Sequence, residues 1–286
     1  MTPIFKYLAE EQARTCGVLL AAGGIRFDLS KNWLGWNVVV DDDEFDDATD
    51  LLEEFIETRL EGNRLFALPH YSERMRGYGI WGALVLLGVH LAVYPSPNRH
   101  LVIQSLGASS TAIMQGEIYR SATALLIHAS HLHLAGNMAG LALFGSAVCS
   151  IMGPGAGWLL ITLTGIGGNL LNAWLYGATH LSVGSSTAVF GAIGILACLQ
   201  FVEKIRRPGN GYRALMPLGG GVALLAILGS GPHTDIMAHL FGFLTGSVIG
   251  FYYAVKIKRL LQFKYQILLL LLTSGLLAVP WLAAPP

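Results

Sequence analysis

The sequence predicts an all-α membrane protein that crosses the bilayer several times and begins with a small α/β domain. Hydrophobic residues make up 53% of the 286 residues, and the mean hydropathy is +0.54. Charged residues make up 13%, against about 25% in an average soluble domain. Long apolar stretches approach the ~20 residues that cross a bilayer. This composition excludes a disordered chain, a collagen-like fibre and a secreted disulfide scaffold.

The formal net charge of zero is the sum of two unlike parts. Residues 1–76 hold 8 basic and 15 acidic residues, a net charge of −7. Residues 77–286 hold 10 basic and 3 acidic residues, a net charge of +7. No basic patch is interleaved with aromatic residues, so we expect no nucleic-acid partner. The three cysteines are scattered and predict buried free thiols: Cys16, Cys149 and Cys198.

The acidic N-terminal part predicts a small α/β domain. Residues 9–25 have a helical pattern that ends at Gly23-Gly24, and residues 26–30 and 35–40 are strand candidates. The acidic run at 41–50 begins a second helix, where carboxylates suit the helix dipole. It lacks the alternating ligands and turn glycine of a calcium loop, so a solvated helix start is expected. The N-terminus has no signal-peptide h-region, so internal segments should direct membrane insertion.

Seven apolar stretches follow and predict membrane-spanning helices. Several are rich in Gly and Ala, which lets helices approach closely in lipid. The seven stretches are 77–95, 131–151, 155–176, 186–203, 212–230, 235–255 and 265–283.

Basic residues between these stretches predict the orientation of the chain. If seven spans form, three basic clusters fall on one side of the membrane, which the positive-inside rule makes cytoplasmic. We therefore expect a multi-pass protein of the cell (inner) membrane, with a cytoplasmic N-terminus and an outer C-terminus. The long segment 96–130 then lies outside, and its low polarity predicts a place in the membrane interface. The clusters are Arg74 and Arg76; Lys204, Arg206, Arg207 and Arg213; and Lys256, Lys258, Arg259 and Lys264.

Three polar groups of residues interrupt the apolar spans, and ionisable residues inside a membrane are functional candidates. The first runs from His128 to Asn137 and places His133 and Asn137 four residues apart on one helical face. The second is Gly184-Ser185-Ser186-Thr187-Ala188-Val189-Phe190-Gly191. The third begins at Ala238-His239 and continues with Gly242, Gly246 and Gly250, a strip on which another helix can pack closely.

Each group alone also fits a structural role. A Gly-x-Ser in a chain with 35 glycines can be small-residue packing, and an intramembrane His can cap a carbonyl group. His128, His131 and His133 lie within six residues, but no HExxH motif and no nearby acid accompany them. We therefore expect neither a metal nor a cofactor.

Taken together and in this order, the three groups resemble the motifs of the rhomboid family of intramembrane serine proteases. Gly116-Glu117-Ile118-Tyr119-Arg120 is similar to the family's Glu-aromatic-aromatic-Arg loop, and Gly167-Gly168-Asn169 to its glycine-asparagine motif. The resemblance covers residues 77–255 and implies a six-helix protease core there. Residues 1–72 would then be a cytosolic α/β domain, and residues 256–286 a linker and an additional transmembrane helix.

The chemistry of peptide hydrolysis and the resemblance assign the same roles. Hydrolysis needs a nucleophile, a base that takes its proton, and donors for the oxyanion. Ser186 is the expected nucleophile and His239 the general base of a Ser–His dyad, because no acid is placed to orient His239. Phe190 is expected to stack on the imidazole, and His133, Asn137 and the Ser186 amide to form the oxyanion hole. Gly184 and His128 are expected to support this site.

Two residues depart from the family pattern. Thr187 stands where glycine is usual, and its branched side chain can narrow the expected oxyanion pocket or slow turnover. Ile118 replaces one aromatic residue of the loop. His131 matches no position of the family, and Ser185 is a decoy beside the expected nucleophile.

The sequence therefore predicts a serine endopeptidase that cleaves transmembrane-helix substrates near their outer membrane end. The expected partners are such substrates and the lipid bilayer. One alternative is a catalytically impaired rhomboid-like protein that binds transmembrane clients without cleavage. A transporter that uses the His cluster is a second alternative, but the internal repeat common in transporters is missing.

Overall fold

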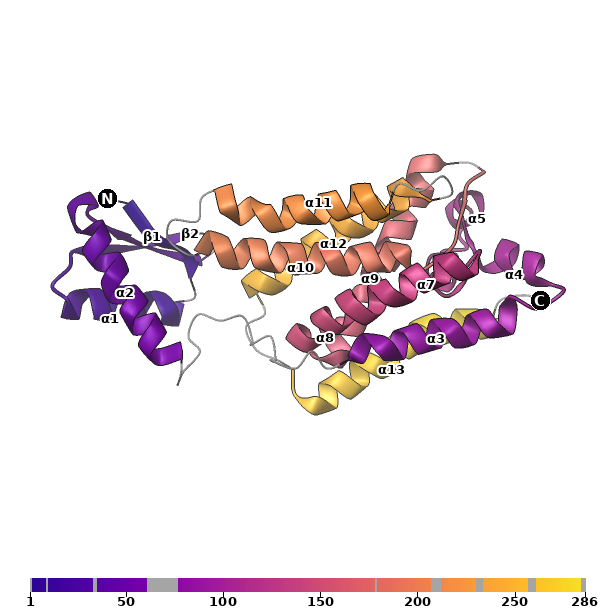
Figure 1. Ribbon diagram of the computed structural model, residues 1–286, viewed down its shortest axis with the longest axis horizontal. Helices are drawn as coiled ribbons and strands as arrows, with labels where there is room; N and C mark the ends of the chain where they lie inside the picture. The colour runs from indigo at the N-terminus through magenta and orange to yellow at the C-terminus, as the bar shows by residue number, and fades with distance from the viewer. Residues whose placement is uncertain are drawn as a thin grey trace. The chain divides into compact units, whose positions relative to one another are not determined.

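The computed structural model describes residues 2–8, 10–32, 35–60, 77–177, 179–206, 212–229, 234–256 and 261–283 (Figure 1). The chain divides into two compact units. One joins 1–68 with 199–217 and 252–258, and the other comprises 69–198, 218–251 and 259–286. The predicted domain boundary between 72 and 77 lies outside the described residues, and so do residues 257–260 of the predicted linker before the last helix. That division of the chain stays a prediction.

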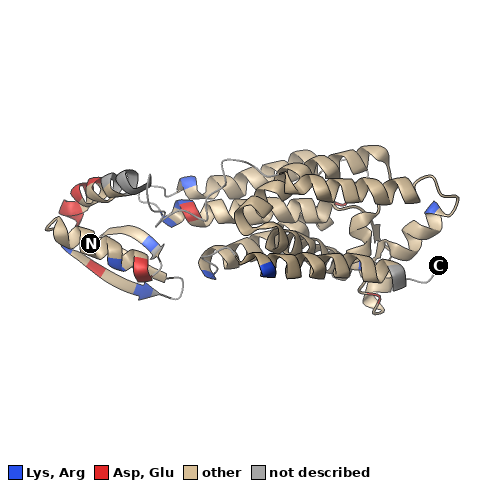
Figure 2. Ribbon diagram, turned by 90° about the horizontal axis from the view of Figure 1, so that it is seen from below, with Lys and Arg blue, Asp and Glu red and all other residues tan. Residues whose placement is uncertain are grey.

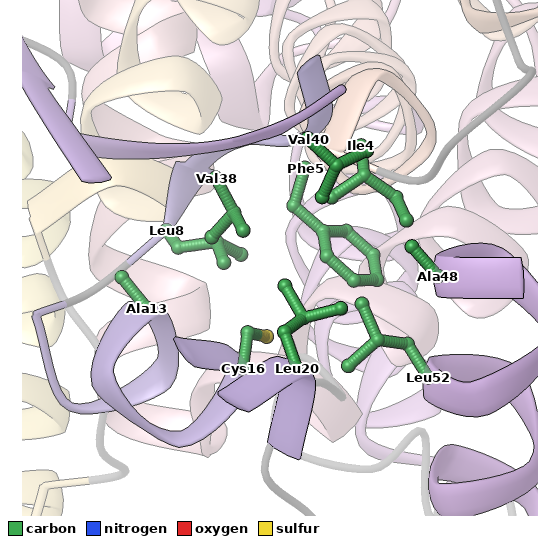
Figure 3. Packing of buried hydrophobic residues seen from close by; sticks show 10 residues of the cluster. All are labelled: Ile4, Phe5, Leu8, Ala13, Cys16, Leu20, Val38, Val40, Ala48 and Leu52. Carbon is green, nitrogen blue, oxygen red and sulfur yellow. The ribbon is translucent and has the colours of Figure 1, made fainter. Parts of the chain in front are cut away.

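The N-terminal part is an α/β module, as predicted. Its antiparallel sheet has the order β1-β3-β2, and its helices α1 and α2 contribute Cys16, Leu20, Ala48 and Leu52 to the core (Figure 3). The burial of Cys16 raises the pKa of its thiol to about 12. The elements are β1 (Thr2–Leu8), α1 (Glu10–Ala22), β2 (Phe27–Asn32), β3 (Gly35–Val40) and α2 (Phe45–Leu60).

Strand β1 is the element that sequence patterning missed. Its pairing with β3 shifts register between Pro3 and Phe5 and again between Phe5 and Leu8. These irregularities bury the neighbours Ile4 and Phe5 together, so the strand lacks the strict alternation of a regular half-buried strand. Because this segment lacks that alternation, its sequence pattern does not predict a strand.

The acidic run forms a short 3-10 turn, Asp42–Glu44, that leads into α2. Arg26, at the end of the loop before β2, forms ion pairs of 3.1 to 3.4 Å with Asp41, Asp43 and Glu44. The guanidinium group is largely exposed, so these pairs are screened surface contacts. The predicted solvated helix start is confirmed, with Arg26 as its counter-charge.

Helices occupy all seven of the predicted apolar stretches. In the part of the chain that the structure describes, five helical segments are long and apolar enough to cross a membrane: His131–Met152, Pro154–Tyr176, Ser186–Arg206, Ile236–Lys256 and Phe263–Trp281. Tyr78–Val93 and Tyr212–Leu228 are shorter apolar helical segments. The elements are α3 (Tyr78–Val93), α7 (His131–Gly140), η3 (Leu141–Gly145), α8 (Ser146–Met152), α9 (Pro154–Tyr176), α10 (Ser186–Arg206), α11 (Met216–Leu228), α12 (Ile236–Lys256) and α13 (Phe263–Ala283).

Charged residues are sparse along these helices (Figure 2). Lys204 and Arg206 lie in the last turn of α10, and Lys256 ends α12. The side chain of Arg206 donates a hydrogen bond to the carbonyl of Ala254. The predicted anchors Arg74, Arg76, Arg207, Lys258 and Arg259 lie outside the described residues, and the orientation of the chain stays a prediction.

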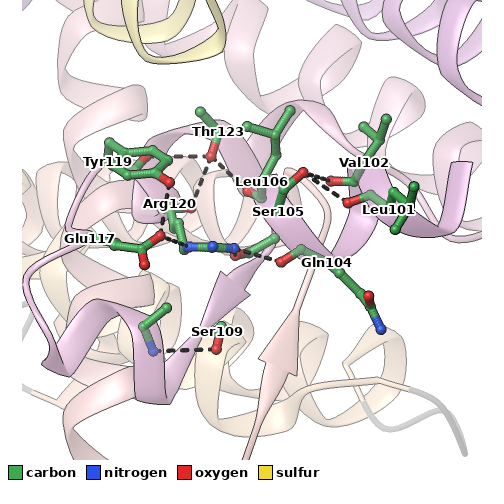
Figure 4. A network of polar contacts seen from close by, with 12 residues as sticks. Leu101, Val102, Gln104, Ser105, Leu106, Ser109, Glu117, Tyr119, Arg120 and Thr123 are labelled. Carbon is green, nitrogen blue, oxygen red and sulfur yellow. Dashed lines mark hydrogen bonds and ion pairs between the residues drawn. The ribbon is translucent and has the colours of Figure 1, made fainter. Parts of the chain in front are cut away.

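The long segment 96–130 is folded. It contains α4 (Arg99–Leu106), β4 (Ala108–Ser109), α5 (Ser110–Met114) and α6 (Arg120–Thr123), and β4 pairs with β5 (Leu181–Ser182). Glu117 accepts hydrogen bonds from Tyr119 (2.8 Å) and Arg120 (2.7 Å) (Figure 4). Arg120 also donates to the carbonyl of Gln104, and the hydroxyl of Thr123 donates to that of Leu106 (both 2.6 Å). The Glu-x-Tyr-Arg motif thus fastens α6 to α4.

Candidate active site

The two residues predicted as a dyad lie in contact. Ser186 begins α10, and His239 lies one turn inside α12. The Nε2 atom of His239 is 2.8 Å from the Oγ atom of Ser186. His239 is 5% exposed, whereas Ser186 is only half-buried. A hydroxyl and an imidazole in this relation can exchange a proton.

Glycines on both helices allow this contact. A Cβ atom at Gly242 or Gly246 would overlap with the carbonyl group of Thr187 or Gly191, and one at Gly250 would lie 2.7 Å from the carbonyl oxygen of Ile195. The predicted glycine strip of α12 is therefore confirmed, and its partner is α10. Because the backbones meet directly, short side chains from the two helices reach one another.

The aromatic ring of Phe190 stacks on the imidazole of His239. The ring centroids are 4.7 Å apart with an interplanar angle of 28°. Phe190 is buried and lies one helical turn after Ser186 on α10. This is the contact that the sequence predicts, and its effect on the orientation of the imidazole stays a prediction.

His133 and Asn137 on α7 face the turn before Ser186. Gly184 has φ of +117° and a Cβ atom there would lie 2.6 Å from His133 Nε2 and 3.3 Å from Asn137 Nδ2. The backbone of this turn therefore needs glycine, both for its dihedral angle and for space. Asn137 is buried, and its Nδ2 atom has no hydrogen-bond partner within the described part of the chain. That amide is a donor available to a ligand.

His128 contacts the same turn. Its Nε2 atom accepts a long hydrogen bond, 3.5 Å, from the backbone amide of Ser185, and its ring meets that of His133 edge-on at 5.2 Å. Burial lowers the pKa of His128 to about 3, so its imidazole is neutral and can accept. The side chain of Ser185 is buried, and its hydroxyl finds no partner among the described residues. Of the two adjacent serines, Ser186 is the one bonded to His239.

The side chain of Thr187 points toward α9. Its hydroxyl donates a 2.9 Å hydrogen bond to Asn169, whose amide in turn donates to the carbonyl of Ser121 at 2.9 Å. Its methyl group fills the space above Gly168. The hydroxyl and methyl groups of Thr187, which the sequence predicts could narrow the oxyanion pocket, thus both contact α9. They also give a role to Asn169, the last residue of the glycine-asparagine motif.

His131, which had no assigned role, belongs to a separate aromatic cluster. Its Nδ1 atom is 3.0 Å from Nε2 of His90 on α3, and its ring lies against Tyr94 at 4.1 Å. Arg99 stands over the ring of Tyr94 at 3.9 Å. Sequence reasoning missed His90, because it lies 41 positions away in a uniformly apolar span.

Two further residues were missed near the site. They are His180 and Asn172, which both form hydrogen bonds to the carboxylate of Asp235 just before α12. No local motif links them, since they lie 55 and 63 positions from Asp235. Within the described ranges, no three His, Cys, Asp or Glu side chains converge as metal ligands would.

The long apolar helices define a multi-pass helical membrane protein. A family model described as the Rhomboid domain matches residues 115–256, which include the three polar groups on α7, α10 and α12. The chain belongs to the rhomboid family.

Relatives in this family differ in length and in their described activity. RHOMBOID-like protein 1 of Arabidopsis thaliana is 30% identical over 158 residues, which cover 54% of this chain and 40% of the relative. YdcA of Bacillus subtilis, described as a proposed rhomboid protease, is 26% identical over 193 residues, 66% of this chain and 96% of the relative. Inactive rhomboid protein 2 of Homo sapiens is 32% identical over 168 residues, 55% of this chain and 18% of the relative. The chain thus spans about two fifths of the Arabidopsis protein.

Proposed function

We propose that this protein is an intramembrane serine endopeptidase that cleaves transmembrane helices near their outer membrane end. The observation that carries the proposal is the 2.8 Å contact between Ser186 Oγ and His239 Nε2. It joins a half-buried hydroxyl to a buried imidazole within the rhomboid domain.

The proposed reaction has two stages. Ser186 Oγ attacks the scissile carbonyl carbon while His239 Nε2 takes its proton, and His239 then returns that proton to the leaving amine. The amide bond breaks and an acyl ester on Ser186 remains. A water molecule, deprotonated by His239, then hydrolyses the ester and regenerates the serine. The stack of Phe190 keeps the imidazole in one orientation throughout.

The oxyanion of each tetrahedral intermediate needs hydrogen-bond donors already in place. The unpartnered Nδ2 group of Asn137, the imidazole of His133 and the backbone N–H of Ser186 are the proposed donors. Support comes from the position of both side chains beside Gly184, immediately before Ser186.

A dyad, rather than a triad, accounts for the contacts of His239. Within the described chain, the Nδ1 atom of His239 has no hydrogen-bond partner, and a Cβ atom at Gly229 would lie 3.2 Å from it. Asp235 lies one turn earlier, but its carboxylate accepts from His180 and Asn172. Among the described residues, therefore, no carboxylate is bonded to the imidazole.

Transmembrane helices with a small residue before the cut are the proposed substrates. Cleavage requires a locally unwound helix, and unpaired backbone groups are costly in lipid, so helix breakers in the substrate should favour cleavage. The proposed orientation places the N-terminus in the cytoplasm and the C-terminus outside an inner cell membrane. Residues 77–255 would form the protease core, residues 1–72 a cytosolic domain and residues 256–286 a linker and an added span.

The test is cleavage of a model transmembrane substrate by the purified protein in liposomes. Ser186→Ala and His239→Ala should abolish cleavage, while Ser185→Ala, the matched control, should retain it. Full cleavage by Ser186→Ala would overturn the proposal.

A second candidate is a non-cleaving protein that binds transmembrane clients. A specific observation favours it: the human relative of 32% identity is named an inactive rhomboid protein. Cross-linking a transmembrane client to wild-type protein that never cleaves it would support this candidate. Client binding followed by cleavage would reject it.

A further inference from the structure

Only three carboxylate side chains occur between residues 77 and 286, and one of them, Asp235, is partly buried four positions before His239. The side chain of Asp235 is 12% exposed. Its Oδ2 atom lies 2.6 Å from His180 Nε2 and 2.6 Å from Asn172 Nδ2. Its Oδ1 atom accepts a 3.0 Å hydrogen bond from the amide of Ala238. Removing most of a carboxylate from water is costly unless hydrogen bonds replace the lost hydration, and this one has three donors.

These contacts join three separate parts of the fold. Asn172 lies in the last two turns of α9, and Asp235 immediately precedes α12. His180 precedes β5, the strand that leads to α10. His180 is itself fixed, because its carbonyl accepts from the amide of Ser110 at 2.9 Å and its ring stacks on Tyr176 at 4.0 Å.

Both members of the dyad follow closely after this junction. The amide of His239 donates to the carbonyl of Asp235 at 3.1 Å, so Asp235 closes the first turn of α12, and His239 follows directly after that turn. Ser186 lies six positions after His180, beyond β5 and Gly184. A shift of Asp235 relative to His180 would therefore move His239 relative to Ser186. Reacting groups lose rate steeply when they are misplaced by about 1 Å.

We propose that Asp235 is a positioning residue that, through His180 and Asn172, holds the start of α12 against the segment leading to Ser186. The inference rests on the proposed function. Asp235 acts through the backbone of α12 and through its two partners, not as the acid of a triad. The three groups bonded to the carboxylate are His180, Asn172 and the amide of Ala238. All three are donors, so position 235 requires an acceptor with two oxygens.

Three variants separate the hydrogen bonds from mere packing. Asp235→Asn keeps an oxygen for the Ala238 amide but turns an N–H group toward the donors His180 and Asn172. His180→Leu removes the donor, and His180→Gln replaces it with an amide N–H near the position of Nε2. We expect kcat for a transmembrane substrate to fall about tenfold to a hundredfold in Asp235→Asn and His180→Leu, with KM little changed. His180→Gln should stay within about threefold of wild type.

Gln266 provides the matched control. It is also a buried polar bridge, since its Oε1 accepts from the Ala156 amide at 2.9 Å and its Nε2 donates to the Met152 carbonyl at 3.1 Å. Gln266→Leu should lower the melting temperature in detergent without lowering kcat. Wild-type kcat in His180→Leu, or an equal loss in His180→Gln and His180→Leu, would overturn the inference.

A spectroscopic signal separates this inference from the proposed function. The ¹⁵N resonance of His239 Nε2 reports its hydrogen bond to Ser186 and needs no turnover. It should shift in Asp235→Asn and His180→Leu and stay in place in His180→Gln and Gln266→Leu. A wild-type protein that cleaves nothing would reject the proposed function, while the ¹⁵N signal would still decide the positioning role. An unchanged ¹⁵N signal in His180→Leu would overturn the positioning role of Asp235.

Discussion

Thr187 directly follows the proposed nucleophile on α10, and its hydroxyl donates a 2.9 Å hydrogen bond to the Oδ1 atom of Asn169 on α9. Thr187 is 1% exposed, and Asn169 is 3% exposed. The bond therefore ties the first turn of α10 to the middle of α9 inside the bundle. It gives the residue that departs from the family pattern a structural function.

Replacing Thr187 by Val should reduce stability more than activity. Valine has nearly the same shape but leaves the Oδ1 atom of Asn169 buried without its donor, a loss of about 1–3 kcal/mol. Thermal unfolding in detergent should show a lower melting temperature for Thr187→Val, and Thr187→Ser should restore it. A melting temperature equal to wild type in Thr187→Val would mean that the bond contributes nothing.

Removing the amide of Asn137 should slow turnover without weakening substrate binding. One oxyanion donor is worth ~2.7–4 kcal/mol, which corresponds to about a hundredfold to a thousandfold in kcat. Steady-state cleavage of a transmembrane substrate by Asn137→Ala measures this loss. The control is Met138→Ala, at the next position of α7. A change confined to KM would instead assign Asn137 to substrate binding.

A methyl group at Gly246 should separate the two helices that carry the dyad. The new Cβ atom would overlap with the carbonyl group of Gly191, and overpacking of this kind costs about 1–3 kcal/mol. Gly246→Ala should lower both the melting temperature and the cleavage rate. Gly275→Ala on α13 is the control, because nothing lies within 4 Å of its Cβ position. Equal behaviour of the two variants would contradict the close packing of α10 and α12.

Acid should weaken the network around Glu117. The hydrogen bonds from Arg120 and then Tyr119 lower the pKa of Glu117 below its ordinary value of 4.5. A lowered pKa means that the carboxylate stabilises the fold above about pH 4.5 and loses this effect as the pH falls through the folded-state pKa. Glu117→Gln should therefore melt below wild type at pH 6, and the difference should shrink below pH 4.5. A difference that stays constant to pH 3 would exclude this role of the charge.

Features that depend on the spacing of residues within one helix could be predicted from the sequence. The i,i+4 pair of His133 and Asn137 and the glycine repeat on α12 follow from helical geometry alone, and both were found as expected. Apolar stretches gave the positions of the spans, although α3 and α11 are too short to qualify by length.

Other features depend on tertiary contacts that no pattern encodes. The bulges of β1 hide its strand character, and the direction of the Thr187 side chain depends on Asn169, 18 positions away. The bonds of Asp235 to His180 and Asn172 form only when three parts of the fold meet. Polar contacts between residues far apart in the chain are therefore the features that the sequence does not predict.

The most direct test of the central claim is where a fluorophosphonate attaches. The reagent phosphonylates a serine only when a neighbouring base activates its hydroxyl. Peptide mass spectrometry of the labelled wild-type protein should locate the adduct on Ser186, and His239→Ala should lose it. Absence of any adduct in the folded wild-type protein, or an adduct on Ser185 instead, would contradict the proposed Ser186–His239 dyad.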